Sequence, residues 1–372
     1  MRIAQIAPPW VAVPPVGYGG IERIISQLTE ELVRRGHEVT LFATGDSTTG
    51  ATLSYVFEKA VGNNFFLKAN PFTTSFQVYP AFKNAASFDI IHSHEIQSLF
   101  FANLTKTPFV HTLHGTMYAD ELDELKRKCY QTFSGVSYVS ISDSQRQGLP
   151  ELNYTATVYN GIDMGEFAFS DTRGTYAVWL GRITPKKGVA EAIEVAKRVG
   201  IPLTIAAAID PVDQPFFDTI VAPLVDGTRV RFVGELHGKE KSELLRSAAV
   251  LLMPIRWHEP FGLVMPEAMA CGTPVIATRF GSTAEIIKDG VTGYVVEGTL
   301  WDVKEPISNW KKDEEGIANM TEALKKLLSL DDAAYRGMRV SSRKHAQDHF
   351  TIEKMVDGYE AVYRDLISKK TT

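Results

Sequence analysis

Short apolar runs that alternate with helical patterns constrain the fold of this chain more than any other feature. The run Arg2–Ala7 is followed by apolar residues at helical spacing from Ile21 to Leu32, and Gly36 stands where that helix should stop. The next strand begins at His37, and further strands are expected at Phe88–His92, Pro108–His114, Val136–Ile141 and Thr157–Tyr159. Strands that are regularly separated by helices form a parallel sheet covered on both faces.

The pattern restarts after a polar segment near residues 167–175. Ala177–Leu180 is predicted to be a strand and Val189–Val199 a helix. Later elements are expected at Leu203–Ala207, Val230–Val233, Lys239–Ala248, Val250–Met253, Pro274–Ala277 and Gly293–Val296. The sequence therefore predicts an α/β protein with two doubly wound, Rossmann-like domains, residues 1–166 and 167–351, and an amphipathic last helix over residues 352–372.

Composition excludes several classes of protein. The 372 residues suit two domains of roughly 150 residues each, and 44% hydrophobic with 22% charged residues is an ordinary globular mixture. A net charge of −5 argues against a nucleic-acid partner. The two cysteines, Cys129 and Cys271, are too few for a disulfide framework, and no apolar run approaches the ~18 residues of a membrane span. We therefore expect a soluble protein of a reducing cytoplasm.

Two loops that follow predicted strands have the composition of a phosphate site. Gly17-Tyr18-Gly19-Gly20 precedes the first helix, but Glu22 stands where the dinucleotide fingerprint needs its third glycine. The loop is either a flexible turn or a set of backbone N–H groups presented to an anion, and its position favours the anion. In the second loop, residues 181–188, Arg182 and Lys187 can converge on one phosphate, although basic loop residues are often merely solvated.

The strongest signal is the segment from His258 to Ile276, which carries two glutamates eight positions apart, one before a predicted helix and one inside it. If the segment is largely helical, Glu259 and Glu267 lie roughly 12 Å apart along the axis, so that one could hold a sugar and the other a ribose. A diphosphate between them would receive the backbone N–H groups of Phe261, Gly262, Leu263 and Val264. The alternative is that Glu267 is an ordinary solvent-facing helix residue, which its apolar neighbours disfavour.

These residues resemble a known family. The motif E-P-F-G-L-V-M-P-E at 259–267 is similar to the signature of the retaining GT-B glycosyltransferases of family 4, also called glycosyl transferase group 1. Motifs that resemble the same family in the same order are G-G-I-E at 19–22, D-I-I-H at 89–92, H-T-L-H-G at 111–115, Y-N-G-I-D at 159–163, the Gly181–Gly188 loop and F-T-I-E-K-M at 350–355. The resemblance covers nearly the whole chain.

The resemblance implies transfer of a sugar from a nucleoside diphosphate donor, with retention of the anomeric configuration. It implies two Rossmann-like domains facing across a cleft, the first on the acceptor side and the second binding the donor, with the last helix crossing back to the first domain. The resemblance also implies roles for site residues by matching position. Arg182 and Lys187 would neutralise the leaving diphosphate, and Glu259 would bind sugar hydroxyls, Glu267 the ribose, with His114 beside the reacting carbon. The residues implied to hold the donor phosphate and sugar are Gly19, Gly20 and the amides of Phe261, Gly262, Leu263 and Val264.

The substrates are defined only by class. The base is expected against loops such as the one containing Gly234 and Glu235, and a UDP-sugar is favoured on family frequency. The acceptor is a small molecule, a glycan or a lipid-linked molecule, and membrane contact is at most peripheral. The sequence defines no oligomeric state.

The residues favour chemistry without a metal or other cofactor. No two aspartates stand at positions i and i+2, so the D-x-D that holds a divalent ion in the other large glycosyltransferase fold is missing. Two cations and helix N-termini can neutralise the leaving group instead. His92, His94, Glu95, His111 and His114 could be metal ligands, but no nearby Asp or Cys completes a set, so we expect them to flank a substrate.

Two rival functions remain. A nucleotide-sugar epimerase with the same architecture would need no acceptor, and the glutamate pair argues against it. A catalytically silent nucleotide-sugar binding protein should have lost Arg182, Lys187 or a signature glutamate, and all of them are present.

Overall fold

The computed structural model describes residues 1–17, 19–62, 64–302 and 304–371. Tyr18, in the glycine loop, lies outside the described residues. The chain forms two compact units, Met1–Gly161 with Ile352–Thr372, and Ile162–Thr351. The division therefore falls at residue 161, slightly before the border at 166 drawn from sequence. 

The first unit is built on a seven-stranded parallel sheet with the order β3-β2-β1-β4-β5-β6-β7. Its strands are β1 (Arg2–Ile6), β2 (Glu38–Phe42), β3 (Thr52–Ser54), β4 (Ile90–Ser93), β5 (Phe109–Thr112), β6 (Ser137–Ser140) and β7 (Tyr154–Thr157). The strand order reverses between β1 and β4, and in open α/β sheets ligands bind at the carboxyl ends of the strands at such a point.

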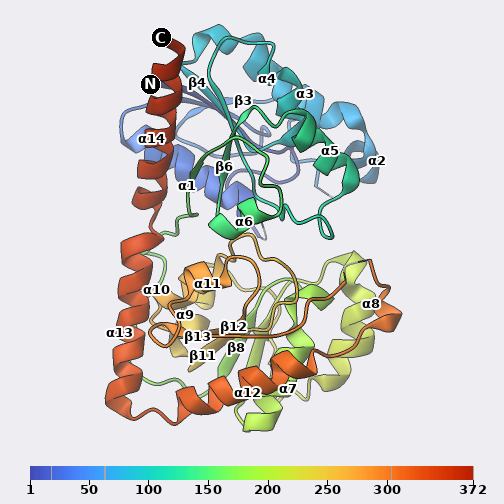
Figure 1. Cartoon of the computed structure of the whole chain (residues 1–372), viewed down its shortest axis with the longest axis vertical. Helices are drawn as coiled ribbons and strands as arrows, with labels where there is room; N and C mark the ends of the chain where they lie inside the picture. Colours follow the sequence, from blue (N-terminus) through green and yellow to red (C-terminus); the bar gives the residue numbers. More distant parts are fainter. Residues whose placement is uncertain (18, 63, 303, 372) are drawn as a thin grey trace. The chain divides into compact units, whose positions relative to one another are not determined.

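Helices cover the first sheet. They are α1 (Gly20–Arg34), α2 (Phe65–Ala69), α3 (Pro71–Lys83), α4 (Leu99–Ala102), α5 (Glu124–Thr132), α6 (Asp143–Gln147) and α14 (Ile352–Thr371). The last helix, α14, packs beside α1 (Figure 1) and contacts β7. Glu360 on α14 accepts from His37 Nε2 at 2.7 Å, and Asp357 pairs with Arg35 at 2.7 Å. The final helix is therefore part of the first unit, although 190 residues of the second unit separate it in sequence.

The second unit has a six-stranded parallel sheet with the order β10-β9-β8-β11-β12-β13. Its strands are β8 (Ala177–Leu180), β9 (Leu203–Ala206), β10 (Val230–Phe232), β11 (Val250–Met253), β12 (Val275–Thr278) and β13 (Gly293–Val296). Here the strand order reverses between β8 and β11, so a ligand of the second unit is expected at the loops that follow these two strands.

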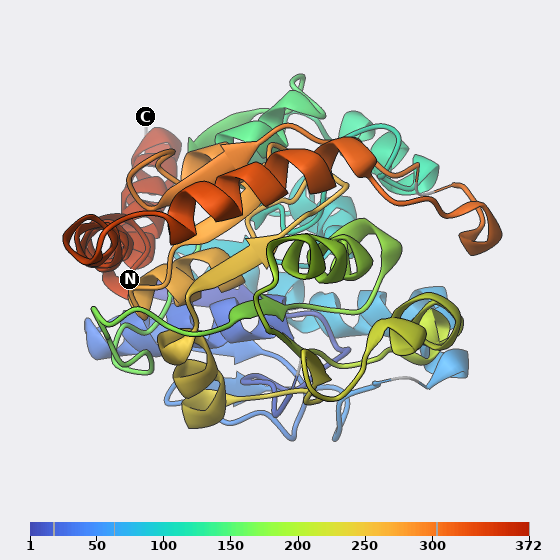
Figure 2. The ribbon, with the colours of Figure 1, turned by 90° about the horizontal axis from the view of Figure 1, so that it is seen from below.

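The second sheet is also covered by helices. These are α7 (Val189–Val199), α8 (Gln214–Phe216), α9 (Gly238–Ser247), α10 (Val264–Ala270), α11 (Thr283–Ile286), α12 (Glu314–Leu328) and α13 (Asp332–His349). Figure 2 shows α12 crossing the sheet, where it packs against α7. Trp179, Ile193 and Met320 bring β8, α7 and α12 into one buried core. Within the described residues, every helix is too short or too polar to span a bilayer.

Candidate active site

The turn from β8 to α7 is held against the loop that follows β11. Gly188 ends the turn with φ +71°, and a Cβ at this position would lie 1.8 Å from the Pro254 carbonyl oxygen. The Lys186 carbonyl accepts from the Arg256 amide at 2.8 Å, and the Lys187 carbonyl accepts from Trp179 Nε1 at 3.1 Å. Only glycine combines this left-handed backbone with so close an approach. The two loops at the reversal point therefore form one fixed surface.

Lys187 and Glu259 meet on this surface. Lys187 Nζ lies 2.5 Å from Glu259 Oε2, and the same oxygen accepts from Trp257 Nε1 at 3.0 Å. The Lys187 ammonium also lies 4.9 Å from the centre of the Trp257 ring. The Glu259 side chain is only 7% exposed and the Lys187 side chain 21%, so the pair is largely removed from water. The structure thus joins two residues predicted from sequence and adds Trp257, which had not been predicted.

Arg182 lies on the same turn and pairs with a carboxylate that the sequence did not indicate. Its Nε lies 3.2 Å from Oδ2 of Asp213, which is in a short 3-10 turn at Pro211–Asp213. Burial raises the pKa of Asp213, and the Arg182 charge opposes that shift. Because the Arg182 side chain remains 36% exposed, its guanidinium is oriented by Asp213 and still accessible to an anion.

The backbone around Glu259 is fixed by the turn after β12. The Glu259 carbonyl accepts from the Ser282 amide at 2.9 Å, and Ser282 Oγ donates to the Phe261 carbonyl at 2.8 Å. At Gly281, with φ +62°, a Cβ would lie 2.2 Å from the Glu259 carbonyl oxygen. Gly281 and Ser282 therefore hold the turn after β12 against the loop that carries Glu259, a role that no sequence motif had indicated.

Glu259 lies before a helix and Glu267 inside it, as the sequence predicted, but the segment between them is not largely helical, so the spacing of roughly 12 Å along one helix axis does not apply. Helix α10 covers only Val264–Ala270, and Glu259 lies in the loop before it. Gly262 has φ +76° and turns the chain between the two glutamates. Phe261 is buried, whereas Leu263 and Val264 are partly exposed where the loop leads into α10.

Glu267 is buried in α10 and is paired rather than solvent-facing. Its Oε1 lies 2.7 Å from Nζ of Lys241, which is on α9. The side chains are 6% and 14% exposed, respectively. Lys241 is a further residue that the sequence did not single out, because it lies 26 residues away on another helix.

Gly234 and Glu235 follow β10, which β9 and β8 separate from β11 in the second sheet. Gly234 has φ +76°, and its carbonyl accepts from the Ala207 amide at 2.9 Å. Glu235 is partly exposed and lies 3.6 Å from His237 Nε2. These residues therefore lie just after a strand end, as expected.

In the first unit, Gly19 and Gly20 begin α1 after the long loop that follows β1. A Cβ on Gly19 would lie 2.6 Å from Pro15 Cβ and 3.2 Å from Glu22 Oε2. Glu22 is buried in the first turn of α1, and burial raises its pKa. The absence of a side chain at Gly19 thus allows Pro15 to pack closely against the start of the helix.

His114 follows β5 and belongs to a cluster of histidines at the carboxyl ends of β4 and β5. Its Nε2 lies 2.8 Å from His94 Nδ1, and the rings of His92 and His94 are 4.2 Å apart. Burial lowers the pKa of His114 to about 4 and of His111 to about 3, and lowers that of His92 and His94 well below the ordinary value. These histidines are therefore neutral at pH 7.

Two of the histidines named as possible metal ligands, His92 and His94, have hydrogen-bond partners at both ring nitrogens. His92 Nε2 lies 2.7 Å from Thr112 Oγ1, and His94 uses its two nitrogens on His114 and Gln5. Across the part of the chain that the structure describes, no three His, Cys, Asp or Glu side chains converge as metal ligands would.

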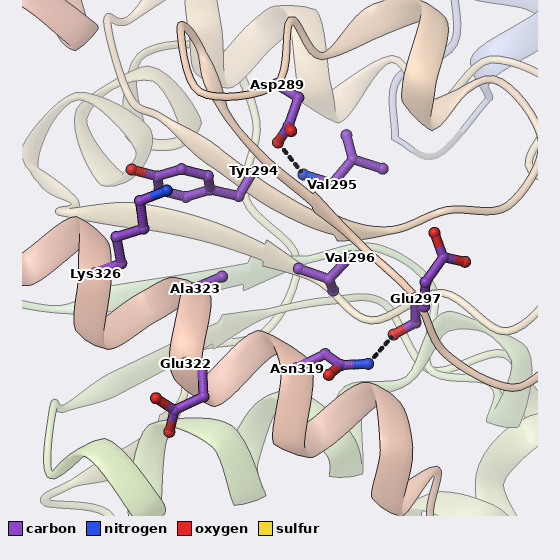
Figure 3. Close-up of a pocket in the computed structure, with 9 residues that line it drawn as sticks. All are labelled: Asp289, Tyr294, Val295, Val296, Glu297, Asn319, Glu322, Ala323 and Lys326. Atoms are coloured by element: carbon purple, nitrogen blue, oxygen red, sulfur yellow. Dashed lines mark hydrogen bonds between the residues drawn. The ribbon is translucent and has the colours of Figure 1, made fainter.

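A surface pocket of about 410 Å³ lies elsewhere in the second unit, between β13 and α12 (Figure 3). Tyr294, Glu322 and Lys326 are among its lining residues, and Lys326 Nζ lies 4.7 Å from the centre of the Tyr294 ring. None of the predicted site residues lines it. The pocket is therefore separate from the loops at the reversal point.

Comparisons with known proteins agree with this architecture. Residues 18–166 match the family described as "Glycosyltransferase Family 4", and residues 166–327 match "Glycosyl transferases group 1". The parallel sheets and their loops define a GT-B glycosyltransferase. The chain belongs to the group 1, or family 4, glycosyltransferases and is an enzyme of that class.

Two curated relatives cover most of the chain. N-acetyl-alpha-D-glucosaminyl L-malate synthase of Bacillus anthracis is 27% identical over 95% of this chain and 95% of its own length. Phosphatidyl-myo-inositol mannosyltransferase of Mycobacterium tuberculosis is 26% identical over 80% of this chain and 82% of its own length. Their names give different acceptors, so relatives at this identity define the reaction class and leave the acceptor open.

Solved structures share the fold. Sucrose-phosphate synthase from Thermosynechococcus elongatus has a TM-score of 0.78 at 20% identity, covering 99% of each chain. Anabaena HepE in complex with UDP and glucose has a TM-score of 0.72 at 16% identity, covering 98% of this chain and 100% of its own.

Replacing Gly188 by alanine should distort the β8–α7 turn. The left-handed φ and the clash with the Pro254 carbonyl together are expected to lower the free energy of unfolding by about 2 kcal/mol or more. Gly227→Ala is a matched control, because Gly227 has φ +74° with nothing within 4 Å of its Cβ position. Urea unfolding of both variants measures the difference, and equal losses would show that close approach at Gly188 contributes nothing.

Because the buried histidines are neutral, we expect the free energy of unfolding to depend on pH, and a variant of His111 can isolate the contribution of that residue. His111 is buried between Tyr130 and Tyr138, and its folded pKa, about 3, lies below the unfolded value of about 6.5. Burial of the neutral ring therefore makes its full contribution to the free energy of unfolding above pH 6.5. Below that pH the unfolded state takes up a proton, and the free energy of unfolding falls by about 1.4 kcal/mol for each pH unit. Glu95 and Glu191, whose pKa values rise to about 7, act in the opposite direction.

Comparison with His111→Phe removes those opposing contributions, because both proteins share them. We expect the stability of the wild type, relative to His111→Phe, to decline between pH 6.5 and 5 in urea unfolding. A constant difference over that range would contradict the neutral burial of His111.

Proposed function

We propose that the chain transfers a sugar from a nucleoside diphosphate sugar, with a UDP-sugar favoured, to a hydroxyl acceptor, retaining the anomeric configuration and needing no metal ion. The observation that carries this proposal is the clustering of Arg182, Lys187 and Glu259 on the loops after β8 and β11, at the reversal point of the second sheet. The fold shared with a protein solved in complex with UDP and glucose supports the choice of uridine.

In this proposal the second unit binds the donor. Arg182 and Lys187 face the diphosphate, Glu259 accepts hydrogen bonds from the donor sugar and Glu267 accepts them from the ribose. Gly234 and Glu235 lie toward the base, and the loop Phe261–Val264 completes the site. The first unit, with Gly19, Gly20 and His114, takes the acceptor side. A small molecule, a glycan or a lipid-linked hydroxyl could all serve as acceptor.

The reaction needs stabilisation of a leaving group more than it needs a base. The bond from the anomeric carbon to the diphosphate oxygen breaks, and the acceptor oxygen forms a bond to the same face of that carbon. The acceptor proton passes to the departing phosphate oxygen. Negative charge grows on the diphosphate, where two cations already oriented by Asp213 and Glu259 would be most effective.

Lys187 and Lys241 are paired with Glu259 and Glu267, respectively. A bound donor would bring a diphosphate to Lys187 and hydroxyl groups to the glutamates. Donor hydroxyl groups that donate to Glu259 would free the Lys187 charge to act on the diphosphate. This arrangement favours a charged donor that also carries hydroxyl groups.

A thermal-shift panel with UDP, GDP, ADP and dTDP, each with and without EDTA, tests the proposal. A ligand at a hundredfold excess over its dissociation constant stabilises the fold by about 2.7 kcal/mol. We expect UDP to give the largest shift and EDTA to leave it unchanged. No shift with any of the four diphosphates would contradict binding of these donor classes, and a shift abolished by EDTA would contradict metal independence.

A further inference from the structure

A chain of buried hydrogen bonds within the first unit leads to His114 from the centre of the sheet and from the last helix. Gln5 on β1 is fully buried and donates from Nε2 to the Tyr363 hydroxyl of α14 at 3.0 Å. Its Oε1 lies 3.1 Å from His94 Nε2, and His94 Nδ1 lies 2.8 Å from His114 Nε2. One residue of β1, one that follows β4, one that follows β5 and one of α14 are thus connected in series.

We propose that Gln5 and His94 are positioning residues that hold His114 in the tautomer with hydrogen on Nε2, so that its Nδ1 is presented as a hydrogen-bond acceptor. The inference deepens the proposed function, since it rests on a role for His114 in sugar transfer. It assigns that role a chemistry: His114 accepts a hydrogen bond from a neutral hydroxyl group of a substrate.

The direction of each hydrogen bond follows from the one before it. An amide oxygen can only accept, so His94 must carry its hydrogen on Nε2 where it faces Gln5 Oε1. A neutral imidazole has one N–H, so His94 Nδ1 is an acceptor. The hydrogen in the bond between the two histidines therefore belongs to His114 Nε2. Nothing among the described residues hydrogen-bonds to His114 Nδ1, which keeps its lone pair.

The same glutamine connects the histidines to the last helix. The Tyr363 hydroxyl accepts from Gln5 Nε2 at 3.0 Å and lies 2.7 Å from His92 Nδ1, and His92 Nε2 lies 2.7 Å from Thr112 Oγ1. All of these groups are buried, so the Gln5 amide has no water to which it could turn, and reversing it would also reverse the hydrogen bond between His94 and His114.

The tautomer has a consequence for specificity. A lone pair on Nδ1 can accept from a sugar or acceptor hydroxyl and cannot donate to a phosphate or carboxylate oxygen. Burial, which lowers the pKa of His114 to about 4, also prevents the ring from becoming a cation at neutral pH. His114 would therefore select a hydroxyl, and the charged parts of the donor would be left to Arg182 and Lys187.

Nitrogen-15 NMR of histidine-labelled protein tests the inference without relying on enzyme activity. Long-range correlations between ring protons and nitrogens identify the tautomer, and the spectrum of His114→Ala assigns the His114 signals. We expect the wild type at pH 7 to show hydrogen on Nε2 of His114. Hydrogen on Nδ1 would overturn the inference and would leave the proposed function standing.

The variant Gln5→Leu removes the acceptor that fixes His94. We expect the His114 signals to shift to a mixture of tautomers and kcat for transfer to fall about tenfold, the effect of one hydrogen bond. The matched control is Gln77→Leu, which removes another buried glutamine of the same unit that donates to the Phe42 and Ala7 carbonyls. An unchanged tautomer in Gln5→Leu, or an equal change in Gln77→Leu, would contradict the positioning role.

Should Gln5→Leu fail to fold, Tyr363→Phe keeps the inference testable. It removes the hydroxyl that orients the Gln5 amide and leaves the contact with His94 in place. A mixed tautomer at His114 is expected, and a spectrum identical to the wild type would overturn the assigned polarity. Absence of any transfer by the wild type, with the expected tautomer present, would instead count against the proposed function.

Discussion

Replacing Lys187 by alanine is expected to lower kcat/KM by about two to three orders of magnitude, the usual cost of removing one group that stabilises developing negative charge. Lys187 Nζ is held 2.5 Å from Glu259 Oε2 beside the turn that carries Arg182, so its charge is fixed where a diphosphate would leave. Steady-state kinetics with the donor identified by the thermal-shift panel measures the effect.

The variant needs controls because it also leaves the buried Glu259 without its cation. Arg182→Ala removes the other cation and leaves Asp213, whose side chain is 11% exposed, without its partner in the same way, so the unfolding midpoint of each variant is measured and turnover is compared where both are folded. Lys197→Ala, on the exposed surface of α7, should change neither. Turnover like the wild type in both Arg182→Ala and Lys187→Ala would remove the phosphate assignment.

Replacing Arg339 by methionine is expected to lower the stability of the second unit by at least about 3 kcal/mol, because several buried carbonyl groups lose their donor together. Arg339 is fully buried in α13, and its guanidinium donates to the carbonyls of Ser170, Ala248 and Arg246 at 2.7, 2.8 and 2.7 Å. Methionine retains much of the packing, so the loss reports mainly the hydrogen bonds.

Arg336→Met, on the same helix, is the matched control. Its side chain is 66% exposed and pairs with Asp171 at 3.4 Å, a contact of the kind that contributes about 0–1 kcal/mol. Denaturant unfolding of both variants provides the comparison. A loss of under about 1 kcal/mol for Arg339→Met would mean that α13 is held by apolar packing alone.

The fold was predictable where strands are fully buried. Ala177–Leu180, Val250–Met253 and Gly293–Val296 have the predicted bounds, because buried parallel strands are continuous apolar runs. The seventh strand of the first sheet was predicted at Thr157–Tyr159 and lies at Tyr154–Thr157. Its residues are all half-buried at the sheet's edge, so the sequence there has little hydrophobic contrast from which to place a strand.

The sequence predicted which loops form the candidate site, but it did not predict which side chains pair with one another there. Arg182 and Glu267 stand in recognisable motifs, but their partners Asp213 and Lys241 gave no signal, because tertiary packing alone brings each pair together. Trp257 is only two residues from Glu259, but no motif marked it. The sequence placed Glu259 before a helix and Glu267 inside it, and it did not show that Gly262, with a positive φ, turns the chain just before α10. The direction of the His94–His114 bond depends on a glutamine 89 residues from His94, which no local pattern reports.

The measurement that tests the central claim most directly is isothermal titration calorimetry of UDP and UMP against the wild type, Arg182→Ala and Glu267→Gln. If the loops after β8 and β11 hold the donor, the wild type should bind UDP more tightly than UMP. Arg182→Ala should lose that preference, because its charge acts on the second phosphate, while Glu267→Gln should weaken both nucleotides alike. Equal binding of UDP and UMP by the wild type, or a preference unchanged in Arg182→Ala, would contradict the account.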